Sequence, residues 1–193
     1  MSTVAIHDAD AGWPAEFRRV AASVRSLLGE PALRIDHIGS TSVPGLDAKD
    51  VIDVQVTVGD ESSVEAAAER LAAAGWRVAP SGISDHVAPG ASPDPAQWAK
   101  RFSREPPEER RVNLHVRIAG RANQRYALLF RDYLREHPAA ASAYGAFKRR
   151  AAALLPDDIA TYADLKDPVC DLIYLPAEEW AARTGWQPGP SDG

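Results

Sequence analysis

Residues 37–58 read HIGSTSVPGLDAKDVIDVQVTV, from His37 to Val58. A short alternating strand enters the pair Gly39-Ser40, a loop with proline and glycine follows, and a second strand begins at residue 51. Along that second strand every other residue is apolar, so Asp53 and Gln55 share the opposite, polar face. We therefore expect a glycine-serine turn and two polar side chains of the next strand to lie on the same side of a sheet.

Secondary structure on both sides of this stretch completes an α/β (α+β) pattern. The predicted helices of this half span 13–28 and 62–74, and the predicted strands span 33–38, 51–58, 75–78, 98–104 and 112–118. By parity, His115 points away from its apolar strand neighbours, as Asp53 does. We predict a core mixed sheet over about 32–118, with Asp53, Gln55 and His115 on one face.

The carboxyl-terminal half is predicted to be helical. The predicted helices span 121–137, 138–154, 159–166 and 168–183, the last of them capped by Asp167. The segment 80–111 is rich in proline, which is typical of a functional lid or an edge hairpin. The sequence has no internal repeat and no linker. We predict one domain over 1–187, with a helical part over about 121–183 and a disordered tail at 188–193.

Composition limits the classes of partner. The 193 residues carry a net charge of −5, with 25% charged and 45% hydrophobic residues, which is typical of a globular protein. A negative surface predicts no duplex nucleic acid partner and no anionic membrane partner. Cys170 is the only cysteine, which excludes an intrachain disulfide and a cysteine-based zinc site. Neither a secretory signal nor a bilayer-spanning run is predicted, so we expect a cytoplasmic protein with a small-molecule or nucleotide ligand.

The glycine-serine turn and the following strand have the residue types of a phosphate site. Glycine lets the backbone approach a phosphate, and serine offers both an N–H and a hydroxyl. A carboxylate such as Asp53 on the next strand can hold Mg²⁺, which prefers hard oxygen ligands and neutralises phosphate charge. The alternative is that Gly39-Ser40 is an ordinary turn and that Asp53 and His115 are solvated. The convergence of these residues on one face favours a ligand site.

At several motifs the sequence resembles the GrpB family of bacterial proteins. The resemblance covers nearly the whole chain and rests on Trp13-Pro14, on 37–46, Ala48-Lys49 and Ile52-Asp53-Val54, on Asn113-Leu114-His115-Val116, on 130–134, and on Tyr162 with Lys166. It implies a nucleotidyltransferase-like fold, in which a mixed sheet is flanked by helices and a carboxyl-terminal helical subdomain closes a cleft.

The resemblance also implies a set of site residues. Asp53, Gln55 and His115 would be the catalytic and metal-binding residues, holding Mg²⁺ or Mn²⁺. The residues implied to bind a nucleoside triphosphate are Gly39, Ser40, Thr41, Lys49, Arg111, Lys148, Tyr162 and Lys166. The fold's pattern has acids where this chain has Gln55 and His115, which disfavours a two-magnesium site. For Tyr162 and Lys166, packing in the core is the alternative to binding.

Two hypotheses follow for the function. In the first, the protein is a nucleotidyltransferase that uses a nucleoside triphosphate and a divalent cation to modify an unidentified small acceptor. In the second, it is a non-catalytic nucleotide- or ligand-binding module, an accessory or sensor domain like the one that some relatives append to dephospho-CoA kinase. The single acid favours the second hypothesis, and the intact Gly39-Ser40 turn with Asp53 favours the first.

Overall fold

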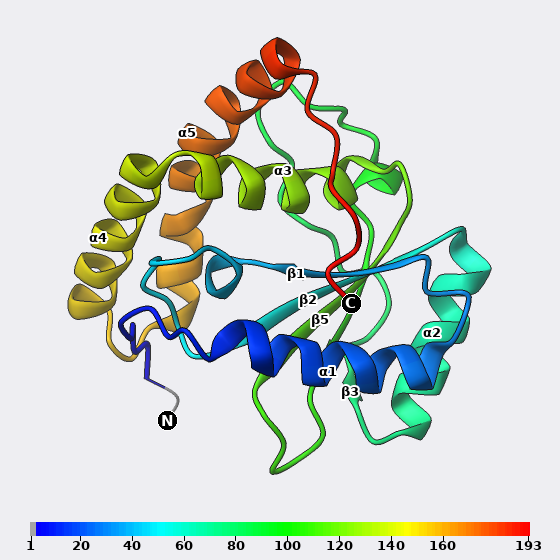
Figure 1. The fold of residues 1–193 in the computed structure, drawn as a ribbon. Helices are drawn as coiled ribbons and strands as arrows, with labels where there is room; N and C mark the ends of the chain where they lie inside the picture. The colour runs from blue at the N-terminus through cyan, green and yellow to red at the C-terminus, as the bar shows by residue number, and fades with distance from the viewer. Residues whose placement is uncertain (1–2) are drawn as a thin grey trace.

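A five-stranded mixed sheet lies at the centre of the computed structural model, which describes residues 3–193 (Figure 1). The strands are β1 (Arg34–Ile38), β2 (Ile52–Val58), β3 (Arg77–Val78), β4 (Arg101–Arg104) and β5 (Val112–Ile118). They are arranged in the order β1-β2-β5-β4-β3, in which only β2 and β5 run parallel. The predicted α/β class and the mixed sheet are confirmed.

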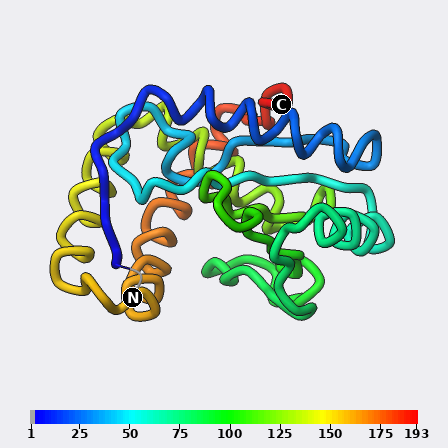
Figure 2. The backbone as a smooth tube through the Cα atoms, turned by 90° about the horizontal axis from the view of Figure 1, so that it is seen from below, coloured from blue at the N-terminus to red at the C-terminus, as the bar shows by residue number. Residues whose placement is uncertain are grey.

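Helices cover both faces of this sheet (Figure 1). They are α1 (Trp13–Leu28), α2 (Glu61–Ala73), α3 (Ala122–Glu136), α4 (Pro138–Leu154) and α5 (Ile159–Thr184), with short 3-10 turns η1 (Ser40–Ser42) and η2 (Pro95–Gln97). α1 and α2 pack on one face, and α3, α4 and α5 gather on the other side. In Figure 2 the amino-terminal segment runs beside α4 and α5, where the Val4 N–H donates to the Pro156 carbonyl.

The face under α1 and α2 is the main hydrophobic core. Val54 and Val56 of β2 and Leu114 and Val116 of β5 are fully buried there. Their alternation with polar residues is the pattern that predicted both strands, and burial of this apolar area drives the sheet and helices together.

The opposite face of β2 and β5 is not a solvated polar surface, which was the alternative to a ligand site there. Gln55 is fully buried, and its Nε2 donates to the Gln124 carbonyl of α3 at 3.1 Å. Thr57 is 1% exposed. α3 lies over this face of the sheet, so the polar side chains of the strands are buried there. Buried polar groups need hydrogen-bond partners within the protein.

The long helix α5 corrects the prediction of two helices separated at Asp167. It is capped by Asp158, whose side chain accepts a hydrogen bond from the Thr161 N–H, and it continues from Ile159 through Pro168 and Pro176 to Thr184. A proline removes one helical hydrogen bond. Here the packing of buried side chains such as Tyr174 outweighs that loss.

The carboxyl-terminal tail is also ordered, against the prediction of disorder for 188–193. The Ser191 hydroxyl accepts from the Ile35 N–H at 2.9 Å and donates to the Ile35 carbonyl at 2.8 Å. The Asp192 carboxylate accepts from the His37 N–H and from Arg131. The tail thus covers the free edge of β1 (Figure 1), which supplies the hydrogen bonds that an edge strand lacks.

The proline-rich segment forms an irregular hairpin beside the sheet. The Asp85 N–H donates to the Trp98 carbonyl, and the Lys100 N–H donates to the Ile83 carbonyl. Trp98 is 1% exposed and packs with Leu129 of α3. The segment is therefore anchored between the sheet and the helical part.

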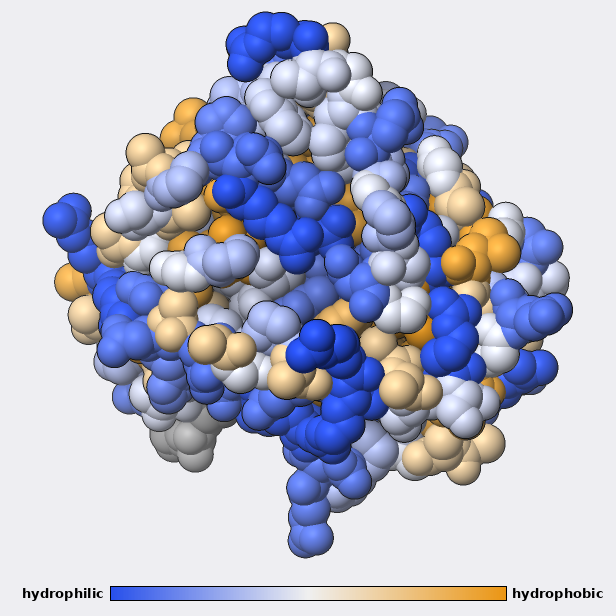
Figure 3. Space-filling view, viewed as in Figure 1, coloured by the Kyte–Doolittle hydropathy of each residue, from blue (hydrophilic) through white to orange (hydrophobic). Residues whose placement is uncertain are grey.

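The surface shows no large apolar face from the side seen in Figure 3. Hydrophilic side chains dominate this view, and hydrophobic ones form small separate patches. None of the helices within residues 3–193 is both long and apolar enough to cross a bilayer.

Candidate functional site

The Gly39-Ser40 turn joins β1 to η1 at one end of the sheet. Gly39 has a φ of +68°, which only glycine adopts readily. A Cβ at this position would come 2.8 Å from Cβ and Cγ of Asp53, so the glycine also makes room for that side chain. The turn and Asp53 are therefore in direct contact, as the sequence predicts.

Asp53 lies between β1 and β5. It pairs with Ile38 in the antiparallel register and with Asn113 in the parallel one. The Asn113 amide donates to the Asp53 carboxylate at 2.8 Å. Burial raises the pKa of Asp53, and the nearby charges of Lys166 and Lys49 act against that shift. A half-buried carboxylate with one side-chain hydrogen bond can still interact with a ligand in the adjoining cavity.

Asp53 and His115 line a common cavity of about 350 Å³. Its walls come from β1, β2, β5, α3, α5 and the segment 84–100, and they include Tyr126, Phe130 and Lys166. Burial lowers the pKa of His115 well below its usual value, and the charge of Arg117 acts in the same direction. Its Nδ1 is buried without a partner. The imidazole is therefore neutral at pH 7.

Gln55 does not present a free oxygen to this cavity. Its Oε1 accepts a hydrogen bond of 2.6 Å from Arg117, and its Nε2 is bonded to α3. The amide thus ties β2 to β5 and α3, in place of the metal-binding role that the sequence predicts. The physical reason is burial, because an amide with no solvent contact has to satisfy both of its ends within the protein.

Asp85 is a site residue that sequence reasoning missed. Its carboxylate accepts from Arg117 at 2.9 and 3.0 Å, from Lys100 at 2.5 Å and from the Asn123 amide at 3.1 Å. Burial opposes ionisation, but the charges of Arg117 and Lys100 outweigh it and hold the pKa of Asp85 well below its usual value. Asp85 lies in an irregular segment, so no strand parity or motif could have placed it in the cavity.

Lys148 of α4 lies behind the turn. Its Nζ donates to the Ser40 hydroxyl at 2.8 Å and to the Asp47 carbonyl at 2.5 Å. Burial, reinforced by the charge of Lys166, lowers the pKa of Lys148 to about 7. The sequence placed Lys148 in the phosphate site, and the structure brings it into contact with Ser40.

A group of cationic side chains lies around Lys49, close to Asp53. Burial lowers the pKa of Lys49, and the nearby positive charges of Lys166, Arg111 and Arg104 lower it further, while Asp53 raises it. None of these four cationic side chains forms an ion pair within the described residues. We call Lys49, Arg104, Arg111 and Lys166 the cationic rim; Arg104 is the member that the sequence did not single out.

Two predicted binding residues are instead part of the protein interior. The Thr41 hydroxyl donates to the Val51 carbonyl and lies 3.0 Å from His37 Nε2, so it fixes the loop after the turn. Tyr162 is 1% exposed and packs with Val4 beneath the Lys49 ammonium. Of the pair on α5, only Lys166 lines the cavity.

The donor set around Asp53 does not fit the paired metal ions of nucleotidyltransferase chemistry. The Gln55 oxygen is held by the Arg117 guanidinium, and the Asp53 carboxylate lies near the positive charges of Lys166, Lys49 and Arg117. Residues 3–193 contain no group of three His, Cys, Asp or Glu side chains that could hold a metal ion. Hard divalent cations need several oxygen ligands with negative charge, so these residues favour an anion over a cation.

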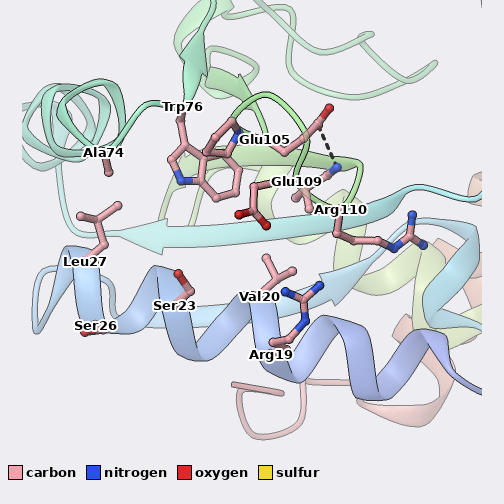
Figure 4. Close-up of a pocket in the computed structure, with 12 residues that line it drawn as sticks. Arg19, Val20, Ser23, Ser26, Leu27, Ala74, Trp76, Glu105, Glu109 and Arg110 are labelled. Atoms are coloured by element: carbon pink, nitrogen blue, oxygen red, sulfur yellow. Dashed lines mark hydrogen bonds between the residues drawn. The ribbon is translucent and has the colours of Figure 1, made fainter.

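A larger cavity, about 640 Å³, lies elsewhere (Figure 4). α1, Trp76 and the loop around Glu109 line it, and it contains none of the predicted site residues. The carboxylate of Glu105 in its wall accepts from the Val112 N–H and from Arg77. Volume alone does not identify a site, and the convergence of polar groups favours the cavity at Asp53.

Comparison with known proteins agrees with the arrangement described above. A family model described as "GrpB protein" matches residues 3–175. A "Dephospho-CoA kinase" of Mycolicibacterium paratuberculosis is 37% identical over 93% of this chain and 47% of its own length, so the chain spans about half of that relative. A "UPF0157 protein" of Halalkalibacterium halodurans is 30% identical over 89% of this chain and 81% of its own length.

A solved structure shares the fold. The crystal structure of the conserved protein GrpB from Enterococcus faecalis superposes with a TM-score of 0.74 and 29% identity, covering 91% of this chain and 99% of that one. The family match over most of the chain, together with this structural likeness, shows that the protein belongs to the GrpB family.

Proposed function

We propose that the cavity at Asp53 binds a polyphosphate ligand of the nucleoside triphosphate type, and that the protein acts as a nucleotide-binding module. One observation carries this proposal: the cationic rim, which has no ion-pair partners in the described chain, lies around Lys49 and close to Asp53, the side chain that contacts Gly39. Lys49 and Lys166 are half-buried, and a cation without a counter-ion in such a position becomes more favourable when an anion binds. A triphosphate supplies that anion.

The groups around the turn support recognition of phosphate in particular. Glycine at 39 allows close approach of the backbone, and Ser40 begins the turn η1 with its hydroxyl bonded to Lys148. Lys166 and Lys49 provide mobile ammonium groups for phosphate oxygens. Tyr126 and Phe130, which stack at 6.0 Å between ring centroids in the same cavity, offer a wall for a planar ring.

Nucleotidyl transfer to a small acceptor is the second candidate function. The contact between Gly39 and Asp53 favours it, because that contact places a carboxylate directly beside the phosphate turn. Release of pyrophosphate from a nucleoside triphosphate, in a mixture of metabolites and with Mg²⁺ or Mn²⁺, would demonstrate transfer. If a triphosphate binds and no pyrophosphate appears, the binding module is the function.

Thermal unfolding with a panel of nucleoside triphosphates and inorganic tripolyphosphate tests the proposal. A ligand at a hundred times its Kd stabilises the folded protein by about 2.7 kcal/mol. The Lys49→Gln/Lys166→Gln double variant should lose this shift. Arg150→Gln, an exposed charge on α4 with no ion pair in the described chain, should keep it. If no triphosphate or tripolyphosphate raises the Tm of the wild type, the proposal is wrong.

A further inference from the structure

We propose that Arg117 is the fixed cation of this site and that the cavity binds its polyphosphate without a divalent metal ion. The inference rests on the proposed function and names the residue that replaces the metal. It starts from the disagreement between the donor set at Asp53 and the metal ions that nucleotidyltransferase chemistry uses.

Arg117 is placed at the cavity by the sheet itself. It follows His115 by two residues on β5, so both side chains lie on the same face, and both line the cavity. Its side chain is 6% exposed. Hydrogen bonds to both oxygens of Asp85 and to Gln55 Oε1 fix the guanidinium plane. Such a rigid guanidinium is pre-organised for oxyanions.

The guanidinium keeps hydrogen-bonding capacity for a ligand. It has five N–H donors, and three of them are used by Asp85 and Gln55. One donor on Nη1 and one on Nη2 have no partner in the described chain. Two neighbouring donors on a planar fork match two oxygens of a phosphate group.

Arg117, Lys100 and Asp85 form an ion-pair cluster with a net positive charge. Arg117 and Lys100 carry two positive charges, and Asp85 carries the one negative charge that both of them contact. All three groups are largely buried, with side-chain exposures of 6%, 11% and 19% in that order. The cluster of these three groups therefore carries a net charge of +1 in a region of low dielectric, where charges act strongly. Lys166 in the same cavity wall adds a positive charge, and Asp53 and Asp167 add negative ones.

The same charges work against a metal ion at Asp53. The positive charges of Lys166, Lys49 and Arg117 already attract the Asp53 carboxylate. Its one side-chain hydrogen bond comes from Asn113. A divalent cation would meet repulsion from these side chains and would find the oxygen of Gln55 occupied. An anionic ligand meets attraction from all of them.

Isothermal titration with tripolyphosphate, in EDTA and then in millimolar Mg²⁺, tests metal independence. We expect binding in EDTA that is at least as tight as binding with Mg²⁺. Binding that requires Mg²⁺ would overturn the role of Arg117 and leave the proposed function intact. Absence of binding under both conditions would overturn the proposed function itself, so the two failures can be told apart.

Variants separate recognition by Arg117 from a purely structural role. Arg117→Met should weaken tripolyphosphate binding about tenfold or more. The control is Arg101→Met, because Arg101 pairs with Glu65 of α2 on the opposite face of the same sheet. Unchanged affinity in a folded Arg117→Met protein would overturn the proposal.

Asp85→Asn keeps the proposal testable if Arg117→Met does not fold. Removing the carboxylate leaves Arg117 and Lys100 uncompensated, so tripolyphosphate should bind more tightly in EDTA. If the salt bridge between Asp85 and Arg117 had only a structural role, Asp85→Asn would not bind tripolyphosphate more tightly than the wild type. Asp53→Asn should likewise tighten binding, since it removes a negative charge from an anion site. Weaker binding of both variants, each shown to be folded by circular dichroism, would overturn the inference.

Discussion

The Lys148 ammonium of α4 donates a hydrogen bond of 2.8 Å to the Ser40 hydroxyl, across 108 positions of the chain. This contact joins the helical half of the protein to the glycine-serine turn, and it holds a positive charge where the interior disfavours one. The consequence is a measurable dependence of stability on pH.

The pKa of Lys148 predicts that stability increases with pH above neutrality. The folded protein releases the Lys148 proton near pH 7, whereas the unfolded chain keeps it up to the ordinary value of 10.5. Between these values the unfolded state binds more protons, so Lys148 makes the free energy of unfolding rise with pH, by up to about 1.4 kcal/mol per pH unit. Urea unfolding of wild type and Lys148→Met between pH 7 and pH 10 measures this slope. Equal slopes would show that Lys148 keeps an ordinary pKa.

Asp53 predicts the opposite dependence at acidic pH. Burial raises the pKa of Asp53, so the folded protein binds its proton more tightly than the unfolded chain does. The contribution of Asp53 to stability is therefore present at low pH and is lost as pH rises through the raised pKa. Asp53→Asn should be more stable than wild type at pH 7 and equal to it at low pH. Asp164→Asn, at an exposed position of α5, is the control; a less stable Asp53→Asn protein at pH 7 would contradict the prediction.

Gly39→Ala should displace Asp53 and destabilise the fold. The new Cβ would lie 2.8 Å from Asp53 carbons, and the φ of +68° is unfavourable for alanine. We expect a loss of at least about 1–2 kcal/mol in the free energy of unfolding. Gly120→Ala has a similar φ of +77° with nothing within 4 Å, so it reports backbone strain alone. If the free energy of unfolding falls equally in both variants, the contact between residue 39 and Asp53 does not affect stability.

The tail that covers β1 predicts an effect on self-association. Ser191→Ala/Asp192→Ala removes the side chains that bond to Ile35, His37 and Arg131. The exposed edge of β1 should then pair with other molecules, because free strand edges template association. Light scattering coupled to size exclusion measures the mass. Gly189→Ala, where a Cβ would meet nothing within 4 Å, should leave the mass unchanged. A double variant with the same mass as the wild type would show that the tail does not protect the edge.

Local patterns in the chain predicted the strands β2 and β5, the faces of these strands and the first helix. The alternation in 51–58 and 112–118 predicted β2 and β5, and the first helix was predicted with its observed bounds, 13–28. These features depend on local periodicity, which the chain displays directly. The contact of Gly39 with Asp53 was also predictable, because a turn and the strand after it are close in sequence.

Which polar groups remain available to a ligand depends on tertiary contacts. Gln55 and Thr41 have polar side chains at positions where a ligand could bind. Both are hydrogen-bonded to other residues of the protein instead. Asp85 and Arg117 meet across 32 positions, from an irregular segment and a strand. No periodic pattern in the sequence predicts such contacts, because they depend on how α3 and the segment 80–100 pack over the sheet. Burial then determines the role of each polar group, because a group that is not hydrated needs a hydrogen-bond partner within the protein.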